Sequence, residues 1–185
     1  MAAEDRVEAG AASCDARAPM TTDRDPRPLE EPLDGRLFER NPCWGCSPTH
    51  PFGLRLELRR EGDEVVTEIQ PSEMHQGPPG LMHGGLVFAL ADEVGAWAVL
   101  AATSKFGFTA AFEGKLLKPV RIGQPIEARG RIVKASRRVV DTAVRVIQGG
   151  SDVLAAQVRF VLVDESGAER LLGGPVPEAW KRFSR

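Results

Sequence analysis

One apolar segment, residues 84–103, constrains the fold of this 185-residue chain more than any other feature. It reads as a single helix introduced by His83, and its only acidic residues are the central pair Asp92 and Glu93. An ionised carboxylate in apolar surroundings loses several kcal/mol of hydration unless a partner compensates. We therefore expect a core helix whose acidic pair has a function.

A segment of about 20 apolar residues is also long enough to cross a bilayer. Two acids at mid-depth, and the lack of flanking basic or aromatic belts, argue against a membrane span. The simpler alternative to a functional acidic pair is a structural core helix whose two carboxylates reach solvent at a polar edge.

The composition is that of one globular domain, since 42% of the residues are hydrophobic and 27% are charged. A net charge of -2 provides no basic field for nucleic acid or an anionic membrane. Three cysteines, Cys14, Cys43 and Cys46, cannot all pair, and no apolar signal segment precedes them. We expect a cytoplasmic protein with reduced thiols and no nucleic-acid or membrane partner.

Composition also divides the chain into four segments. Residues 1–35 are rich in proline and charge, and we expect them to form a disordered N-terminal tail. We expect residues 36–51 to form a cysteine-containing leader loop, residues 52–165 the folded domain, and residues 166–185 a C-terminal tail.

The periodicity of the chain changes to two between the leader loop and the helix. Residues 54–59 and 65–70 alternate between apolar and polar positions around a turn at 62–63, which predicts a hairpin. The strands expected after the helix are 108–117, 126–134, 138–147 and 153–163. Their short links imply antiparallel neighbours, so we predict an α+β fold with a curved antiparallel sheet wrapped around one long central helix.

The segment from His75 to Gly85, followed by the acidic pair, resembles the hotdog-fold acyl-CoA thioesterases of the PaaI-like type. Residues 115–123 are similar to a strand end and turn of that family, and residues 43–48 to a leader of some members. The resemblance covers residues 43–165. It implies a hotdog fold, hydrolysis of an acyl-CoA thioester, and a homodimer or dimer of dimers with sites at the subunit interface.

Gly84 lies at the start of the helix, where a backbone N–H lacks a partner and points along the positive end of the helix dipole. A thioester carbonyl held there would be polarised, and losing one such donor typically costs about 2.7–4 kcal/mol of barrier. We assign Gly85 to substrate binding. The alternative is that Gly84 and Gly85 only allow tight helix entry against the sheet.

Asp92 lies about 12 Å along the same helix, at 1.5 Å per residue, so it cannot easily reach a carbonyl held by its own Gly84. A two-fold dimer resolves this, because a partner helix can bring its Asp92 beside this Gly84. Asp92 would act as general base or as nucleophile, and both routes stay open. Glu93 faces about 100° away, which suits a polar contact with substrate or a supporting role.

Three further residues are candidates for the catalytic site. Thr109 matches the position at which the family holds the attacking water, although a strand threonine is also simply a good β-former. Gln76 lies near an Asn or Gln that orients water in relatives, but their Asn position falls on Gly77. His83 is expected to orient the loop by hydrogen bonding rather than exchange protons.

Lys134, Arg137 and Arg138 cluster at an expected turn and are candidates for binding CoA phosphates, although a solvated hairpin end explains such clusters equally. Cys43 and Cys46 have the spacing of a zinc or redox pair. Zinc needs four ligands, and His50 and His75 would complete them only by coincidence of folding, so we expect a reduced, packed pair with no metal or cofactor.

Two other functions remain as hypotheses. Residues 75–80 superficially resemble the loop of hydroxyacyl dehydratases, but the position where those enzymes carry an acid is Ala89. A non-catalytic acyl-CoA-binding module is favoured by Gly77 and opposed by Asp92.

Overall fold

The computed structural model describes residues 33–34 and 41–184. The predicted disordered tail, residues 1–35, therefore lies outside the described residues except for Leu33 and Asp34, which form strand β1. Cys14 and the first part of the predicted leader loop also lie outside them.

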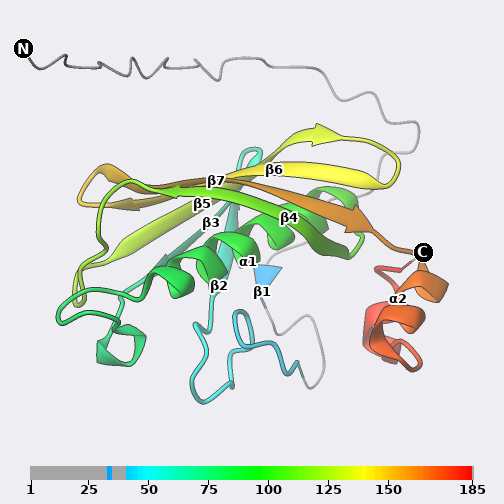
Figure 1. The fold of residues 1–185 in the computed structure, drawn as a ribbon. Helices are drawn as coiled ribbons and strands as arrows, with labels where there is room; N and C mark the ends of the chain where they lie inside the picture. The colour runs from blue at the N-terminus through cyan, green and yellow to red at the C-terminus, as the bar shows by residue number, and fades with distance from the viewer. Residues whose placement is uncertain (1–32, 35–40, 185) are drawn as a thin grey trace, which may run out of the picture.

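The fold has one antiparallel sheet and one long helix, α1, at Gly84–Thr103. The other elements are β1 (Leu33–Asp34), β2 (Glu57–Glu61), β3 (Glu64–Ile69), the short helix η2 (Glu73–His75), β4 (Gly107–Leu116), β5 (Ile126–Ala135), β6 (Val139–Gln148), β7 (Ser151–Leu162), α2 (Glu165–Leu172) and α3 (Glu178–Lys181). The strand order is β1-β2-β3-β5-β6-β7-β4. The sheet arches over α1 (Figure 1), which confirms the predicted α+β architecture.

The helix α1 has the bounds that the apolar segment predicts. His83 caps its start, because the His83 Nδ1 accepts a hydrogen bond from the Gly85 N–H at 3.0 Å. Ser104, in the left-handed region at φ 53°, ends it. By length and a mean hydropathy of 1.6 the helix would be able to cross a membrane. Instead it packs against the sheet, with ten buried residues, and is the core helix.

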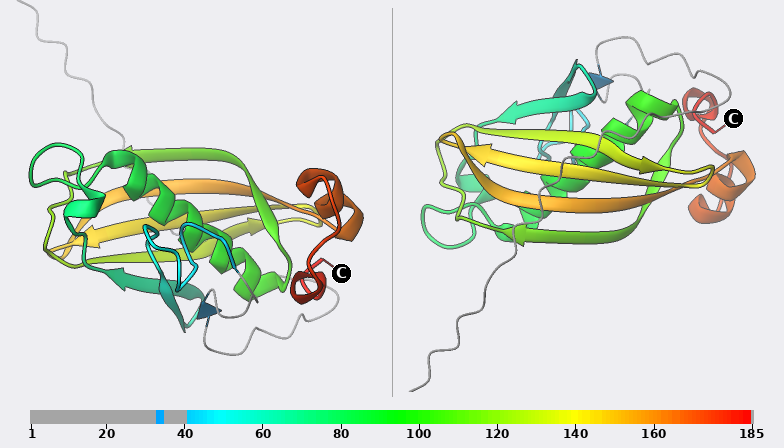
Figure 2. Two further views of the ribbon diagram at one scale, coloured as in Figure 1. Left: turned by 90° about the horizontal axis from the view of Figure 1, so that it is seen from below. Right: turned by 90° about the horizontal axis from the view of Figure 1, so that it is seen from above.

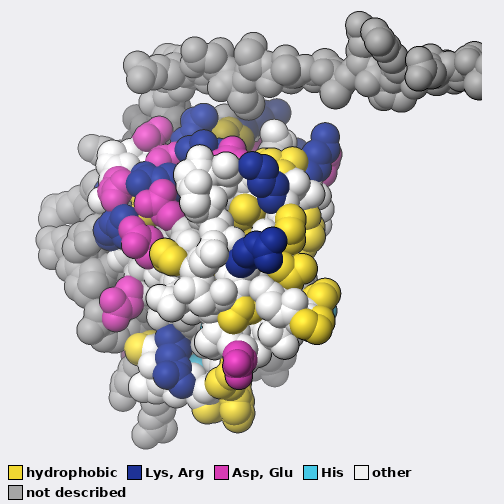
Figure 3. Space-filling model, turned by 90° about the vertical axis from the view of Figure 1, so that its left-hand side faces the viewer, with side chains coloured by type: hydrophobic (Ala, Val, Ile, Leu, Met, Phe, Trp, Pro, Cys, Tyr) yellow, Lys and Arg dark blue, Asp and Glu magenta, His cyan; other side chains and the backbone are white. Residues whose placement is uncertain are grey.

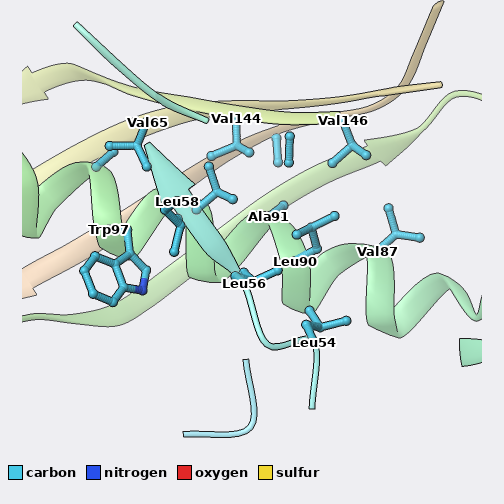
Figure 4. Close-up of a cluster of buried hydrophobic side chains, with 14 of the residues drawn as sticks. Leu54, Leu56, Leu58, Val65, Val87, Leu90, Ala91, Trp97, Val144 and Val146 are labelled. Atoms are coloured by element: carbon cyan, nitrogen blue, oxygen red, sulfur yellow. The ribbon is translucent and has the colours of Figure 1, made fainter. Parts of the chain in front are cut away.

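The core lies between α1, the β2–β3 hairpin and the central strands. Figure 4 shows Leu56 and Leu58, Leu90 of α1, and Val144 and Val146 of β6 directed toward one another. All five are buried, and Leu90 and Val146 are 0% exposed. Alternation on the strands and an apolar helix face therefore supply one continuous hydrophobic layer.

The strands after α1 begin and end within two residues of their predicted positions. The first hairpin strand differs, because β2 begins at Glu57 rather than at residue 54. Arg55 has a left-handed φ of 52°, which interrupts the extended backbone. Its guanidinium donates to the carbonyl oxygens of His50 and Pro51 at 2.8 and 2.9 Å and so ties the leader loop to the hairpin.

Residues 166–185, predicted as a C-terminal tail, fold through residue 184. They contribute most of α2 and all of α3, which lie together at one end of the sheet (Figure 2). Phe183 is 1% exposed, and Phe106 contacts the rings of Trp180 and Phe183 at centroid distances of 5.1 and 5.3 Å. Burial of these aromatic rings holds the segment in place. The short helical patterns in the sequence do not predict this burial.

Gly95 allows α1 to approach the sheet closely. A Cβ there would lie 2.9 Å from Thr142 Oγ1 and 3.2 Å from the Phe160 ring, and both residues are 0% exposed. Gly95→Ala should therefore lower the free energy of unfolding by about 1–3 kcal/mol through overpacking. At an exposed helical position, Gly→Ala would instead raise the free energy of unfolding. Urea unfolding measures the change, with Gly174→Ala as the control, since a Cβ at Gly174 meets nothing within 4 Å.

Candidate active site

Asp92 lies in the middle of α1 and faces strand β4. Its Oδ1 accepts a hydrogen bond from the Thr109 hydroxyl at 2.8 Å. Burial raises the pKa of the Asp92 carboxyl above its ordinary value, and the Thr109 hydroxyl opposes that shift. The structure thus brings together two of the residues predicted for the catalytic site.

A β-bulge in β4 lies directly beside this contact. Thr109 pairs with Phe160 and Ala111 pairs with Arg159, which leaves Ala110 as the extra residue. Bulges disturb the alternation of side chains along a strand and are common next to active sites. This one occurs where the Thr109 hydroxyl meets α1.

Gly84 is the first residue of α1, about two helical turns before Asp92. Within the described part of the chain its N–H donates to no acceptor, whereas the Gly85 N–H is used by His83 at 3.0 Å. Gly84 lines a hollow of about 210 Å³ together with Leu116 and Lys118. The Gly84 amide, rather than that of Gly85, is therefore the one available to a ligand.

His83 and Gln76 lie near Gly84 and organise the loop before α1. His83 caps the helix, and its own N–H donates to the His75 carbonyl at 2.8 Å. The side-chain oxygen of Gln76 accepts from the Gly80 N–H at 3.0 Å. Both residues contact this loop rather than Asp92 of the same chain, so the water-orienting role of Gln76 stays a prediction.

Glu93 contacts the leader loop. The Cys43 thiol lies 3.1 Å from Glu93 Oε1, and the Cys46 N–H lies 3.5 Å from Cys43 Sγ. Burial raises the pKa of Glu93 to about 8. A hydrogen bond from the Cys46 thiol lowers the pKa of Cys43, and the same bond raises that of Cys46. Sequence reasoning missed this contact, and the predicted role of Glu93 in substrate binding stays a prediction.

A second hollow, of about 200 Å³, lies between α1 and the C-terminal helices. Cys43, Cys46 and Glu93 line one side of it. The apolar residues around it include Ala96, Trp97, Leu100, Phe106, Leu172 and Trp180. Ala96 follows Asp92 by one helical turn on the same face of α1, so the hollow begins beside the acid.

The predicted basic cluster is exposed at the turn between β5 and β6. Lys134, Arg137 and Arg138 lie at the end of the sheet where β7 ends and β4 begins, because Val139 pairs with Val161 and Gly107 pairs with Leu162. On the face in Figure 3, Lys and Arg lie among Asp and Glu over one part of the surface. The cluster of Lys134, Arg137 and Arg138 is a candidate for contact with phosphate.

Comparison with known proteins supports the fold. Residues 79–155 match the family model of the thioesterase superfamily. A candidate esterase of Saccharolobus solfataricus is 30% identical over 95 residues, which span 50% of this chain and 63% of that relative. A thioesterase of Haemophilus influenzae shares the fold with a TM-score of 0.57 and 20% identity, over 65% of this chain and 85% of that chain.

A hypothetical thioesterase of Streptococcus pneumoniae, crystallised with coenzyme A, has a TM-score of 0.55 and 20% identity, over 58% of this chain and 87% of that chain. At this identity the solved structures establish the fold alone. They confirm the predicted hotdog fold, and the family-model match over residues 79–155 agrees with the resemblance to thioesterases that the sequence indicated.

Proposed function

We propose that this chain, which has the hotdog fold of the thioesterase superfamily, hydrolyses acyl-CoA thioesters to a free acid and coenzyme A. The observation that carries the proposal is the Asp92 carboxylate, which is partly buried on an apolar helix and held at 2.8 Å by Thr109. A carboxylate kept in such a setting suits a general base or a nucleophile. No step requires a cofactor.

The active site is proposed to form between two copies of the chain. Strand β4 lies at the edge of the sheet, and Phe108 and Leu116 on it are 36% and 48% exposed. A long edge strand with exposed apolar side chains is suited to pairing with another strand. Antiparallel pairing of β4 with its own copy would extend the sheet across a two-fold axis.

This pairing would also complete the site. An antiparallel two-fold pair sets the Gly107 end of one β4 beside the Leu116 end of the other. Thr109 and Asp92 lie at the first end, whereas Leu116 lines the hollow that contains Gly84. Asp92 of one protomer would then approach Gly84 of its partner, which the length of α1 prevents within one chain.

In the proposed reaction the Gly84 N–H polarises the thioester carbonyl and stabilises its developing charge. Asp92 of the partner subunit either takes a proton from a water that attacks the carbonyl carbon, or attacks that carbon itself. The carbon–sulfur bond breaks, and the CoA thiolate leaves and takes up a proton. Where the carboxylate attacks, water then hydrolyses the resulting anhydride.

Lys134, Arg137 and Arg138 are proposed to contact CoA phosphates. They lie at the end of the sheet where β4 begins, which is the end that would adjoin Gly84 of the partner subunit. The crystal of the Streptococcus pneumoniae relative with coenzyme A supports a CoA ligand. The cytoplasm stays the predicted compartment, because reduced thiols suit it.

Steady-state hydrolysis of acetyl-, octanoyl- and phenylacetyl-CoA, followed by thiol release, tests the proposed function. We expect turnover of at least one of them by the wild-type protein. Tight binding of all three without thiol release would favour the non-catalytic module instead. Formation or loss of a double bond without thiol release would favour a hydratase or dehydratase.

Thr109 has a testable role through its hydroxyl. Thr109→Val keeps the shape and the β-propensity but removes the hydrogen bond to Asp92. Since misplacing a catalytic group by about 1 Å can cost about 100-fold in rate, we expect kcat to fall about 10–100-fold. Thr109→Ser, which restores a hydroxyl, should recover most of the activity. Equal activity of the Val variant would leave Thr109 as a β-former only.

The hollow beside Asp92 is proposed to receive the acyl group. Ala96→Leu would fill part of it, because Ala96 lines the hollow and lies one turn from Asp92. A misfit of this size costs about 1–3 kcal/mol, so kcat/KM for octanoyl-CoA should fall about 10-fold or more relative to acetyl-CoA. An unchanged ratio of the two kcat/KM values would assign the acyl group to another place.

A further inference from the structure

We propose that Cys43, Cys46 and Glu93 form a binding site for a divalent transition-metal ion such as zinc. The two Sγ atoms and a Glu93 carboxylate oxygen all lie within 4.8 Å of one another. Two ligands bound to one zinc at about 2.0–2.3 Å lie no more than about 4.6 Å apart. Small side-chain movements would therefore close the three atoms around one ion.

The leader loop is already shaped to present the two sulfur atoms. The Cys46 N–H points to Cys43 Sγ at 3.5 Å, and Asn41 Nδ2 donates to Cys46 Sγ at 3.5 Å. The Oδ1 of Asn41 accepts from the Cys43 N–H at 3.0 Å. Hydrogen bonds of this kind orient metal ligands before the ion arrives, and a C-x-x-C pair has a spacing typical of zinc ligands.

Gly45 brings Glu93 within reach of both sulfur atoms. A Cβ at position 45 would overlap the Glu93 carboxylate, so glycine is needed for this approach. Cys46 is 5% exposed, and Glu93 is partly buried on the rigid core helix. The carboxylate is thus a group built into the contact between loop and helix rather than part of a solvated acidic surface.

Glu93 supplies a third zinc ligand beside the two cysteines, which the sequence alone does not reveal. His50 and His75 are not needed as ligands and make other contacts: His50 Nδ1 accepts from the Phe52 N–H, and His75 Nδ1 accepts from the Ser72 N–H. Three protein ligands with a fourth position open to a water are a regular zinc arrangement. The fourth position here would face the hollow that the three ligands line.

The donor set favours a zinc-like ion over calcium or magnesium, which prefer oxygen ligands. Two thiolates and one carboxylate suit Zn²⁺, with Co²⁺ as a spectroscopic substitute. A Cys43–Cys46 disulfide is the competing use of the pair, but it would not involve Glu93. The bound ion would join the leader loop to α1 at the residue after Asp92, and the site does not depend on the proposed reaction.

The test is a titration of the full chain, reduced and stripped with EDTA, with Co²⁺ and then Zn²⁺. We expect one Co²⁺ per protomer with thiolate-to-cobalt charge-transfer absorption, which Zn²⁺ displaces. Cys43→Ser and Cys46→Ser should abolish this absorption, whereas Cys14→Ser should bind as the wild type does. Glu93→Gln should weaken binding by at least about 10–100-fold, because even residues that only orient metal ligands contribute that much.

Gly45→Ala provides a variant that keeps all three ligands while displacing Glu93, and it should weaken Co²⁺ binding as Glu93→Gln does. Circular dichroism establishes that each variant is folded. Absence of stoichiometric Co²⁺ binding to the reduced wild type would overturn the proposal. Wild-type affinity in folded Glu93→Gln, or recovery of Cys43 and Cys46 only as a disulfide under reducing conditions, would overturn it as well.

Discussion

Asp92→Asn is expected to lower the kcat of thioester hydrolysis by about 10²–10⁴-fold, the contribution typical of a positioned acid–base group. The asparagine retains an oxygen that can accept the Thr109 hydroxyl, so the geometry at 2.8 Å is preserved. What the variant loses is the negative charge and the basic oxygen. Steady-state kinetics with the best acyl-CoA substrate measures the loss.

The stability of the same variant separates chemistry from folding. Burial raises the pKa of Asp92, so its ionised form opposes folding at pH values above its unfolded pKa. Asp92→Asn should therefore have a Tm equal to or higher than that of the wild type. Asp152, a partly exposed acid 3.6 Å from Arg145, provides the matched control for charge, and Asp152→Asn should keep full activity. Near-wild-type turnover in Asp92→Asn would remove Asp92 from the mechanism.

Gly84→Pro is expected to lower kcat by about 10²–10³-fold, because it deletes the one backbone N–H proposed to stabilise the oxyanion. The fold should tolerate the change. Proline is favoured at the first position of a helix, and Gly84 is that residue in α1. The preceding residue, His83, already has φ -62° and ψ 128°, which suits a position before proline.

Gly84→Ala is the matched control for this variant, since it adds a Cβ but keeps the N–H. That Cβ would meet only the tip of the Leu116 side chain, at 3.1 Å, and Leu116 is 48% exposed. We expect Gly84→Ala to keep most of its kcat. Equal losses in the alanine and proline variants would show that crowding, and not the missing donor, is responsible.

The sequence predicts most of the fold because its signals are long and local. The apolar segment 84–103 gives α1 with correct bounds, and strand segments separated by short turns give β4 to β7 to within two residues. The segment after residue 165 carries only short local signals. Asp164 caps α2 and Gly173 ends it, but these short signals become decisive only when Phe183 and its neighbours are buried.

The candidate site is predicted in part. The resemblance to hotdog thioesterases singles out Asp92 and Thr109 separately, and the structure shows that their side chains are in contact; their catalytic roles stay predictions. The Cys43–Glu93 contact joins residues 50 positions apart, and no local spacing in the sequence pairs them. The glycine at position 45 was the only available signal, because a side chain there would exclude Glu93.

Complementation between two inactive variants tests most directly whether the site is shared. In a dimer of Asp92→Asn with Gly84→Pro, one of the two sites would combine an intact Gly84 with an intact Asp92 of the partner subunit. Random mixing makes half of the dimers mixed, so about a quarter of wild-type activity should return where neither variant alone is active. A mixture of the two variants that forms mixed dimers but stays inactive would contradict a site built across the interface.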